Sequence, residues 1–145
     1  MRTRSLPYAA IFSLPLAALA QKSASSIAGT WEGESLCTVR DSPCHDEHVV
    51  YEISRDPAPQ SAAANPQPLD WKMDAFKIVI GEKQSIGSLR CSFDENKKNL
   101  SCLTKTRTEV DWEYFFDGDN LRGTLQIGPG KTLFRRVSAK RVLKV

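Results

Sequence analysis

The chain has 145 residues, 41% of them hydrophobic and 26% charged, with a formal net charge of +3. This length is enough for one domain with a buried core and leaves little for a second. The small net charge gives no electrostatic case for binding nucleic acid or an anionic membrane surface.

The first twenty residues have the features of an export signal. Arg2 and Arg4 precede an apolar run from Leu6 to Leu19, and Ala18-Leu19-Ala20 is a small-x-small cleavage motif. A membrane anchor is the alternative, but the run contains two prolines and is shorter than the roughly 20 residues of a spanning helix. We therefore predict that residues 1–20 are removed, leaving 125 residues without a stable membrane anchor, in a secreted or periplasmic location.

Four cysteines follow this segment: Cys37, Cys44, Cys91 and Cys102. An even number of cysteines in an exported chain of this size indicates disulfides. Six residues lie between Cys37 and Cys44 and ten lie between Cys91 and Cys102, whereas a zinc ribbon usually has Cys-x-x-Cys spacing. Three disulfide pairings are possible from the count alone.

Residues 21–28 are small and polar, and we predict a flexible leader there. Residues 55–68 contain four prolines and are predicted to be a loop. The other segments are short, alternate between apolar and polar residues and end at turn residues, which is typical of an all-β protein. The predicted strands are residues 30–39, 47–54, 76–81, 86–93, 99–106, 109–117, 121–127 and 132–142.

Residues 70–77 are the one segment with two interpretations. Trp71, Ala75 and Ile78 also recur at helical spacing, so a short helix closing one end of the domain is an alternative for residues 70–77.

The segments on either side of "DENKKN" form a predicted hairpin that places Cys91 directly opposite Cys102. Directly opposed residues of antiparallel strands have Cβ atoms close enough for a disulfide, and a slip by one residue would turn one cysteine to the other face. We therefore predict a Cys91–Cys102 disulfide and, by elimination, a Cys37–Cys44 disulfide.

Eight strands in chain order predict an antiparallel meander closed into a barrel, with residues 29–142 as a single domain. The clearest alternation is "VDWEYFFD", with apolar side chains on one face and acidic ones on the other. The predicted interior consists of Trp31, Val49, Tyr51, Ile53, Ile78, Ile80, Leu89, Trp112, Tyr114, Phe116, Leu125 and Phe134.

Gly29-Thr30-Trp31, just before the first predicted strand, resembles the Gly-x-Trp motif of the calycin group, which contains the lipocalins and their smaller relatives. In lipocalins an arginine near the end of the barrel packs across this tryptophan, a favourable cation–π contact. The resemblance implies that Arg135 or Arg136 packs on Trp31. The middle-loop Thr-Asp-Tyr motif and the C-terminal helix of true lipocalins are absent, so the chain resembles a small, exported, lipocalin-like barrel of bacteria with no known activity.

The stretch "CHDEH" contains the strongest candidates for chemistry. His45 and His48 are candidate metal ligands, together with Asp46 and Glu47. In an extended strand the two histidines point to opposite faces, so a polar turn fixed by a disulfide is the favoured interpretation. Ser35 with either histidine provides the residue types of a hydrolase, but no nucleophile elbow or oxyanion element accompanies them.

These observations favour a non-catalytic barrel that binds a small apolar or amphipathic ligand and needs no cofactor. The candidate ligand-binding residues are Trp31, Tyr51, Trp112, Tyr114 and Phe116. Two alternatives remain: a protein-interaction or inhibitor module with a filled core, and a metal-binding protein or histidine-dependent enzyme that uses "CHDEH". We expect a monomer that does not bind nucleic acid.

Overall fold

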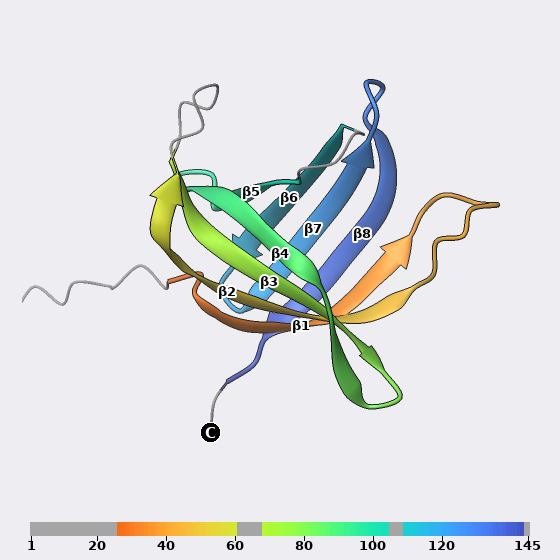
Figure 1. The fold of residues 1–145 in the computed structure, drawn as a ribbon, viewed down its shortest axis with the longest axis horizontal. Helices are drawn as coiled ribbons and strands as arrows, with labels where there is room; N and C mark the ends of the chain where they lie inside the picture. The colour runs from red at the N-terminus through yellow and green to blue at the C-terminus, as the bar shows by residue number, and fades with distance from the viewer. Residues whose placement is uncertain (1–25, 61–67, 105–108, 144–145) are drawn as a thin grey trace, which may run out of the picture.

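The computed structural model describes residues 26–60, 68–104 and 109–143, which form eight strands (Figure 1). The strands are β1 (Gly29–Cys37), β2 (Glu47–Gln60), β3 (Leu69–Val79), β4 (Glu82–Asp94), β5 (Asn99–Leu103), β6 (Val110–Asp117), β7 (Asn120–Ile127) and β8 (Thr132–Arg141). Each strand pairs with the next in antiparallel fashion, and β8 pairs with β1 to close the barrel. The predicted eight-stranded all-β barrel is confirmed. The predicted signal peptide, residues 1–20, lies outside the described residues.

The alternation of the sequence fixes which side chains enter the barrel. In β6, Tyr114 and Phe116 are buried while Phe115 and Asp117 between and after them are exposed. In β7, Leu121, Gly123 and Leu125 are all buried. Successive residues of a strand point to opposite faces, so both strands place one apolar row in the core.

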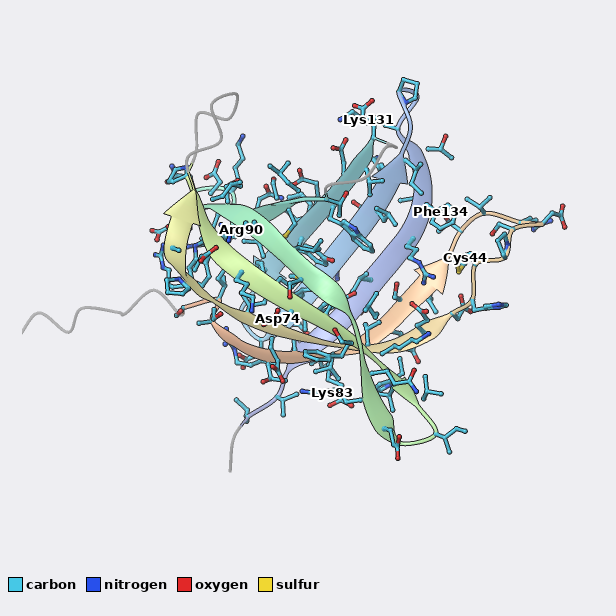
Figure 2. The ribbon with its side chains drawn as sticks, viewed as in Figure 1. Cys44, Asp74, Lys83, Arg90, Lys131 and Phe134 are labelled. Carbon is cyan, nitrogen blue, oxygen red and sulfur yellow. A yellow bond between two sulfur atoms is a disulfide. The ribbon has the colours of Figure 1, made fainter. Side chains whose placement is uncertain are left out.

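The outer wall is polar and carries ion pairs. Lys72 contacts Asp74 at 2.8 Å, Lys131 contacts Asp111 at 2.7 Å, and Lys83 pairs with Glu52 (Figure 2). These groups are at least partly exposed to water, so each pair contributes little to stability. Their main effect is a hydrated outer face.

Two predictions about the second quarter of the chain are wrong. Residues 70–77 form no helix but lie in β3, because Trp71, Met73 and Ala75 alternate with polar residues and are buried. Strand β2 also continues to Gln60, so residues 55–60 are not loop; residues 61–67 lie outside the described part. The pairing with β3 is irregular between residues 55 and 60, where two prolines cannot donate to the ladder.

The hairpin of β3 and β4 extends past the barrel wall (Figure 1), which overturns two predicted core residues. Ile78 falls on the strand face opposite to Trp71 and Ala75, and Ile80 is 98% exposed. Val79 pairs with Glu82, so Ile80 and Gly81 form a two-residue turn with φ of 51° and 78°. The alternation of apolar residues in the sequence therefore continues past the end of the buried core.

Both predicted disulfides are confirmed. Cys91 and Cys102 are paired across β4 and β5 with Cα atoms 4.0 Å apart. Cys37 and Cys44 close the loop between β1 and β2, with Cα atoms 6.0 Å apart. The first disulfide lies in the buried core, whereas the second is at one end of the barrel and is only partly buried.

Candidate ligand-binding cavity

One end of the barrel is filled by its own aromatic side chains. Trp31 meets Phe116 edge-on with ring centroids 5.1 Å apart, and Phe93 meets both Phe116 and Trp71 at 6.0 Å. Leu100 beside them is completely buried. Edge-to-face packing of this kind fills the middle of this end, and the hollows beside it are only about 160 and 250 Å³, so we call it the closed end of the barrel.

Arg141 fastens the closed end. Its guanidinium lies 4.3 Å from the centroid of the Trp31 ring and donates to the carbonyl oxygens of Ser26 and Ala28, each at 2.8 Å. Its Nε donates to Asp119 at 3.0 Å. Trp31 Nε1 donates to the carbonyl of Ile27 at 3.0 Å, and the Ile27 side chain is buried, so the packed part of the chain includes residues before Gly29.

The predicted contact between Trp31 and an arginine therefore exists, but the predicted arginines are wrong. The register of β1 and β8 places Trp31 opposite Arg141 and Cys37 opposite Arg135. Arg135 thus lies at the other end of the barrel, and Arg136 is exposed on the outer wall. A six-residue difference along β8 spans most of the height of the barrel.

The other end of the barrel contains a cavity of about 330 Å³. Its apolar wall comes from four strands and consists of Val49, Ala75, Ile86, Leu89 and Trp112. Its polar lining consists of Ser35, Glu47, Tyr51, Thr104, Tyr114 and Arg135. The volume is at the lower end of the roughly 300–1,000 Å³ typical of small-molecule sites.

Arg135 is the polar centre of this cavity. Its Nη1 donates to Ser35 Oγ at 3.2 Å and to the carbonyl oxygen of His45 at 3.1 Å, and it lies 3.4 Å from Glu47 Oε2. The Arg135 side chain is only 13% exposed. A charge this far from water needs such partners, and here β1, β2 and the loop between them provide all three.

The two tyrosines lie deeper in the cavity. The rings of Tyr51 and Tyr114 meet edge-on at 5.6 Å, and both residues are buried. Burial raises the pKa of Tyr51 to about 12, against smaller opposing effects of the Tyr114 hydroxyl and the Arg135 guanidinium. Burial likewise raises the pKa of Tyr114 well above its usual value. Both side chains are therefore uncharged phenols at neutral pH.

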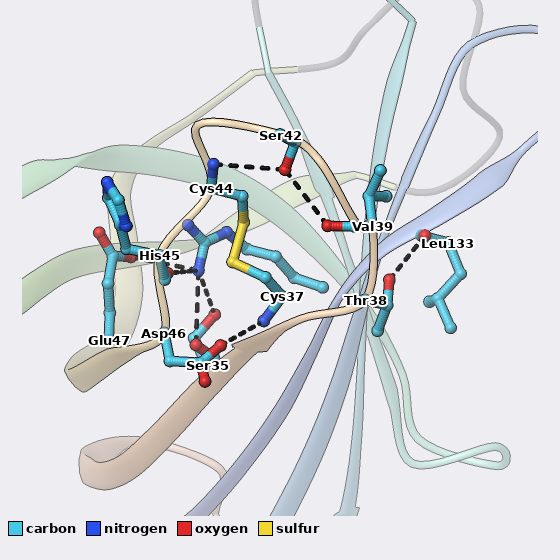
Figure 3. Close-up of a disulfide and its surroundings, with 11 residues drawn as sticks. Ser35, Cys37, Thr38, Val39, Ser42, Cys44, His45, Asp46, Glu47 and Leu133 are labelled. Atoms are coloured by element: carbon cyan, nitrogen blue, oxygen red, sulfur yellow. Dashed lines mark hydrogen bonds and ion pairs between the residues drawn. A yellow bond between two sulfur atoms is a disulfide. The ribbon is translucent and has the colours of Figure 1, made fainter.

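The disulfide loop at this end is held at several points (Figure 3). The Thr38 hydroxyl donates to the carbonyl of Leu133 at 2.7 Å, and the Cys37 N–H donates to Asp46 Oδ1 at 2.8 Å. Ser42 Oγ accepts from the Cys44 N–H at 3.3 Å. The loop therefore presents the His45 carbonyl to Arg135 from a fixed position.

The structure brings together three of the five predicted ligand-binding residues. Tyr51, Trp112 and Tyr114 line the cavity, with the rings of Trp112 and Tyr114 stacked at 5.8 Å. Trp31 and Phe116 lie at the closed end and do not line it.

The histidines of "CHDEH" are not gathered into one site. His48 contacts Glu32 at 2.7 Å on the exposed outer wall, while His45 approaches the cavity residue Arg135 through its carbonyl oxygen. Among the residues that the structure describes, no three His, Cys, Asp or Glu side chains are placed to hold a metal ion.

Sequence reasoning missed Arg135, Glu47 and Ser35 as cavity residues. Arg135 could have been found, because it shares the inward face of β8 with the buried Val137 and Ala139. A charged residue on a buried strand face indicates a polar partner within the barrel.

No family model matches the sequence, and no curated protein matches it. Among solved structures, it is similar to the crystal structure of Rv2717c from M. tuberculosis, with 14% identity and a TM-score of 0.42. The match covers 80% of this chain and 92% of the other. Within residues 26–60, 68–104 and 109–143, no helix has the length and apolar character to cross a bilayer.

Proposed function

We propose that this chain is an exported, disulfide-linked barrel that binds a small amphipathic molecule in the cavity at its open end, without catalysis. The observation that supports this role is the difference between the two ends of the interior: aromatic side chains pack at one end, beside smaller hollows of about 160 and 250 Å³, whereas a cavity of about 330 Å³ lies at the other. A purely structural barrel of eight strands can be filled by its own side chains throughout.

The lining of the cavity suits a molecule with an apolar body and a hydrogen-bonding group. Leu89 and Trp112 provide apolar contact on one side, and Arg135, Tyr51 and Tyr114 provide polar groups on the other. Pockets with few, convergent polar groups on apolar walls are typical of small-molecule sites.

The experiment uses N-phenyl-1-naphthylamine, a neutral dye that fluoresces in apolar surroundings. We expect the oxidised protein to enhance its fluorescence in a saturable manner. Ala75→Phe places a large side chain in the cavity and should abolish the enhancement. Ser54→Phe adds the same bulk at an exposed position of β2 and should not.

Native mass spectrometry of the purified protein complements the dye. A bound organic mass that leaves on denaturation would support the proposal and identify the ligand. Absence of dye binding by a protein with a normal melting curve, or equal binding by Ala75→Phe, would reject the cavity as a binding site. Either result would favour a protein-interaction module.

A further inference from the structure

The charges inside the cavity cancel. Among its described lining residues, Arg135 is the cation and Glu47 is the anion, and their nearest charged atoms are 3.4 Å apart. The side chains are 13% and 26% exposed, so bulk water screens the pair only in part. A ligand therefore enters a site that has two opposite charges but no net charge.

Arg135 has donors left for a ligand. All its hydrogen bonds to described residues use Nη1; neither Nε nor Nη2 donates to any residue in this part of the chain. A guanidinium has five N–H donors, and those on Nε and Nη2 form one planar edge. An oxygen acceptor on the ligand would satisfy this edge.

A second polar atom of the lining lacks a partner. Thr104 Oγ1 is buried and makes no hydrogen bond within the described chain, although Thr104 lines the cavity. Its hydroxyl can donate or accept. With the phenols of Tyr51 and Tyr114, the cavity provides several uncharged hydrogen-bonding groups.

An anionic ligand would be disfavoured at this place. A carboxylate loses much of its hydration free energy in an apolar cavity, and here the attraction of Arg135 is opposed by repulsion from Glu47. An uncharged carbonyl or amide pays a smaller desolvation cost and can still accept from the free edge of the guanidinium. The balance favours uncharged ligands.

We infer that Glu47 makes the cavity selective for uncharged apolar molecules with a hydrogen-bond acceptor, such as an amide, and against carboxylates of the same size. This inference rests on the proposed function, because it assigns the ligand class of the same cavity. Glu47 is then the specificity-determining residue, because its carboxylate neutralises the charge of Arg135 while leaving the guanidinium donors available.

The test compares octanamide with octanoate at pH 8, each displacing N-phenyl-1-naphthylamine from the oxidised protein. We expect octanamide to bind the wild-type barrel at least tenfold more tightly than octanoate. Glu47→Gln removes the opposing charge, so octanoate should gain at least tenfold while octanamide changes less than threefold. Glu47→Asp keeps the charge and should keep the preference for octanamide.

Glu34→Gln is the matched control, because it removes the same charge from the exposed outer face of β1. It should leave both affinities unchanged. Equal or tighter binding of octanoate by wild type would overturn the inference while leaving the proposed function intact, and this comparison needs no variant to fold. An unchanged ratio of the octanamide and octanoate affinities in a folded Glu47→Gln protein would also overturn the inference. Failure of the dye itself to bind would reject the proposed function and the inference together.

Discussion

Tyr51 couples the cavity to the stability of the barrel. It is 3% exposed, and burial raises its pKa from 10.0 to about 12, because a phenolate in this surrounding would lose its hydration. The folded protein therefore holds a proton that the unfolded chain releases near pH 10. Stability from this group is fully present below pH 10 and is lost as the pH rises through about 12.

We predict that the free energy of unfolding falls by about 2 kcal/mol between pH 9 and pH 12 through Tyr51, since one pKa unit corresponds to about 1.4 kcal/mol and the folded phenol is half ionised at about pH 12. Urea unfolding at several pH values measures this change, and Tyr51→Phe should lessen it. Absorbance at 295 nm should show no phenolate from Tyr51 in the folded protein at pH 10.5. A normal phenolate titration near pH 10 in protein that is still folded would contradict the prediction.

Residues of the interior differ in how well the sequence predicts them. Cys91 and Cys102 were predictable as a pair because a short hairpin fixes their register locally. Arg141 was not predictable as the partner of Trp31, because that contact depends on how the last strand pairs with the first. A local pattern shows that Arg135 and Arg141 share a face of β8, but it does not show which of them reaches Trp31.

At the scale of elements, the pairing of β1 with β8 decides whether the sheet closes. Arg141 supports this pairing by stacking on Trp31 and by binding two carbonyl groups of the segment before β1. The Val142 N–H also donates to the Thr30 carbonyl at 2.8 Å. The end of β8 is thereby attached to the start of the barrel by contacts other than the ladder.

We predict that Arg141→Ala destabilises the barrel by about 2 to 4 kcal/mol, because it removes charged hydrogen bonds and a cation–π contact. Thermal and urea unfolding measure the loss. Arg136→Ala, five positions earlier and exposed, is the control and should change stability by about 0.5 kcal/mol or less. An Arg141→Ala protein as stable as wild type would show that the contact does not fasten the closed end.

The elements also show where strand prediction fails. In "AFKIVIGEK" the alternation of Phe76, Ile78 and Ile80 is regular, yet Phe76 and Ile78 lie opposite to the inward row of β3 and Ile80 lies in the exposed turn after it. The upstream Trp71 and Met73 determine the face that enters the barrel, and the hairpin then continues past it. The cavity was equally hidden from the sequence, because its volume depends on how side chains from several strands pack together.

At the scale of the whole molecule, the two disulfides lie in different surroundings. Cys91 and Cys102 are 0% and 3% exposed, whereas Cys37 and Cys44 are half-buried at the open end. Two disulfides in a domain of this size are typical of proteins of oxidising compartments. Loop closure over 7 and 11 residues gives each about 2 to 3 kcal/mol of stabilisation.

We predict that a thiol reductant opens the two disulfides in sequence. Cys37–Cys44 should be reduced in the folded protein, with a modest fall of the melting temperature, and Cys91–Cys102 only when the barrel unfolds. Alkylation followed by mass spectrometry gives the order, and thermal melts give the stability. Simultaneous reduction of both disulfides in native conditions, or an unchanged melting temperature after complete reduction, would contradict this prediction.

The positions of the two ends of the described chain have a practical consequence. Ser26 and the residues after Arg141 both leave the barrel at its closed end, whereas Arg135 and the cavity are at the other. A barrel coupled to a bead, a sensor surface or a fusion partner at either end of the described chain would thus present the opening of its cavity to the solution. The same placement lets a tether on either end hold the barrel without competing with molecules that enter it.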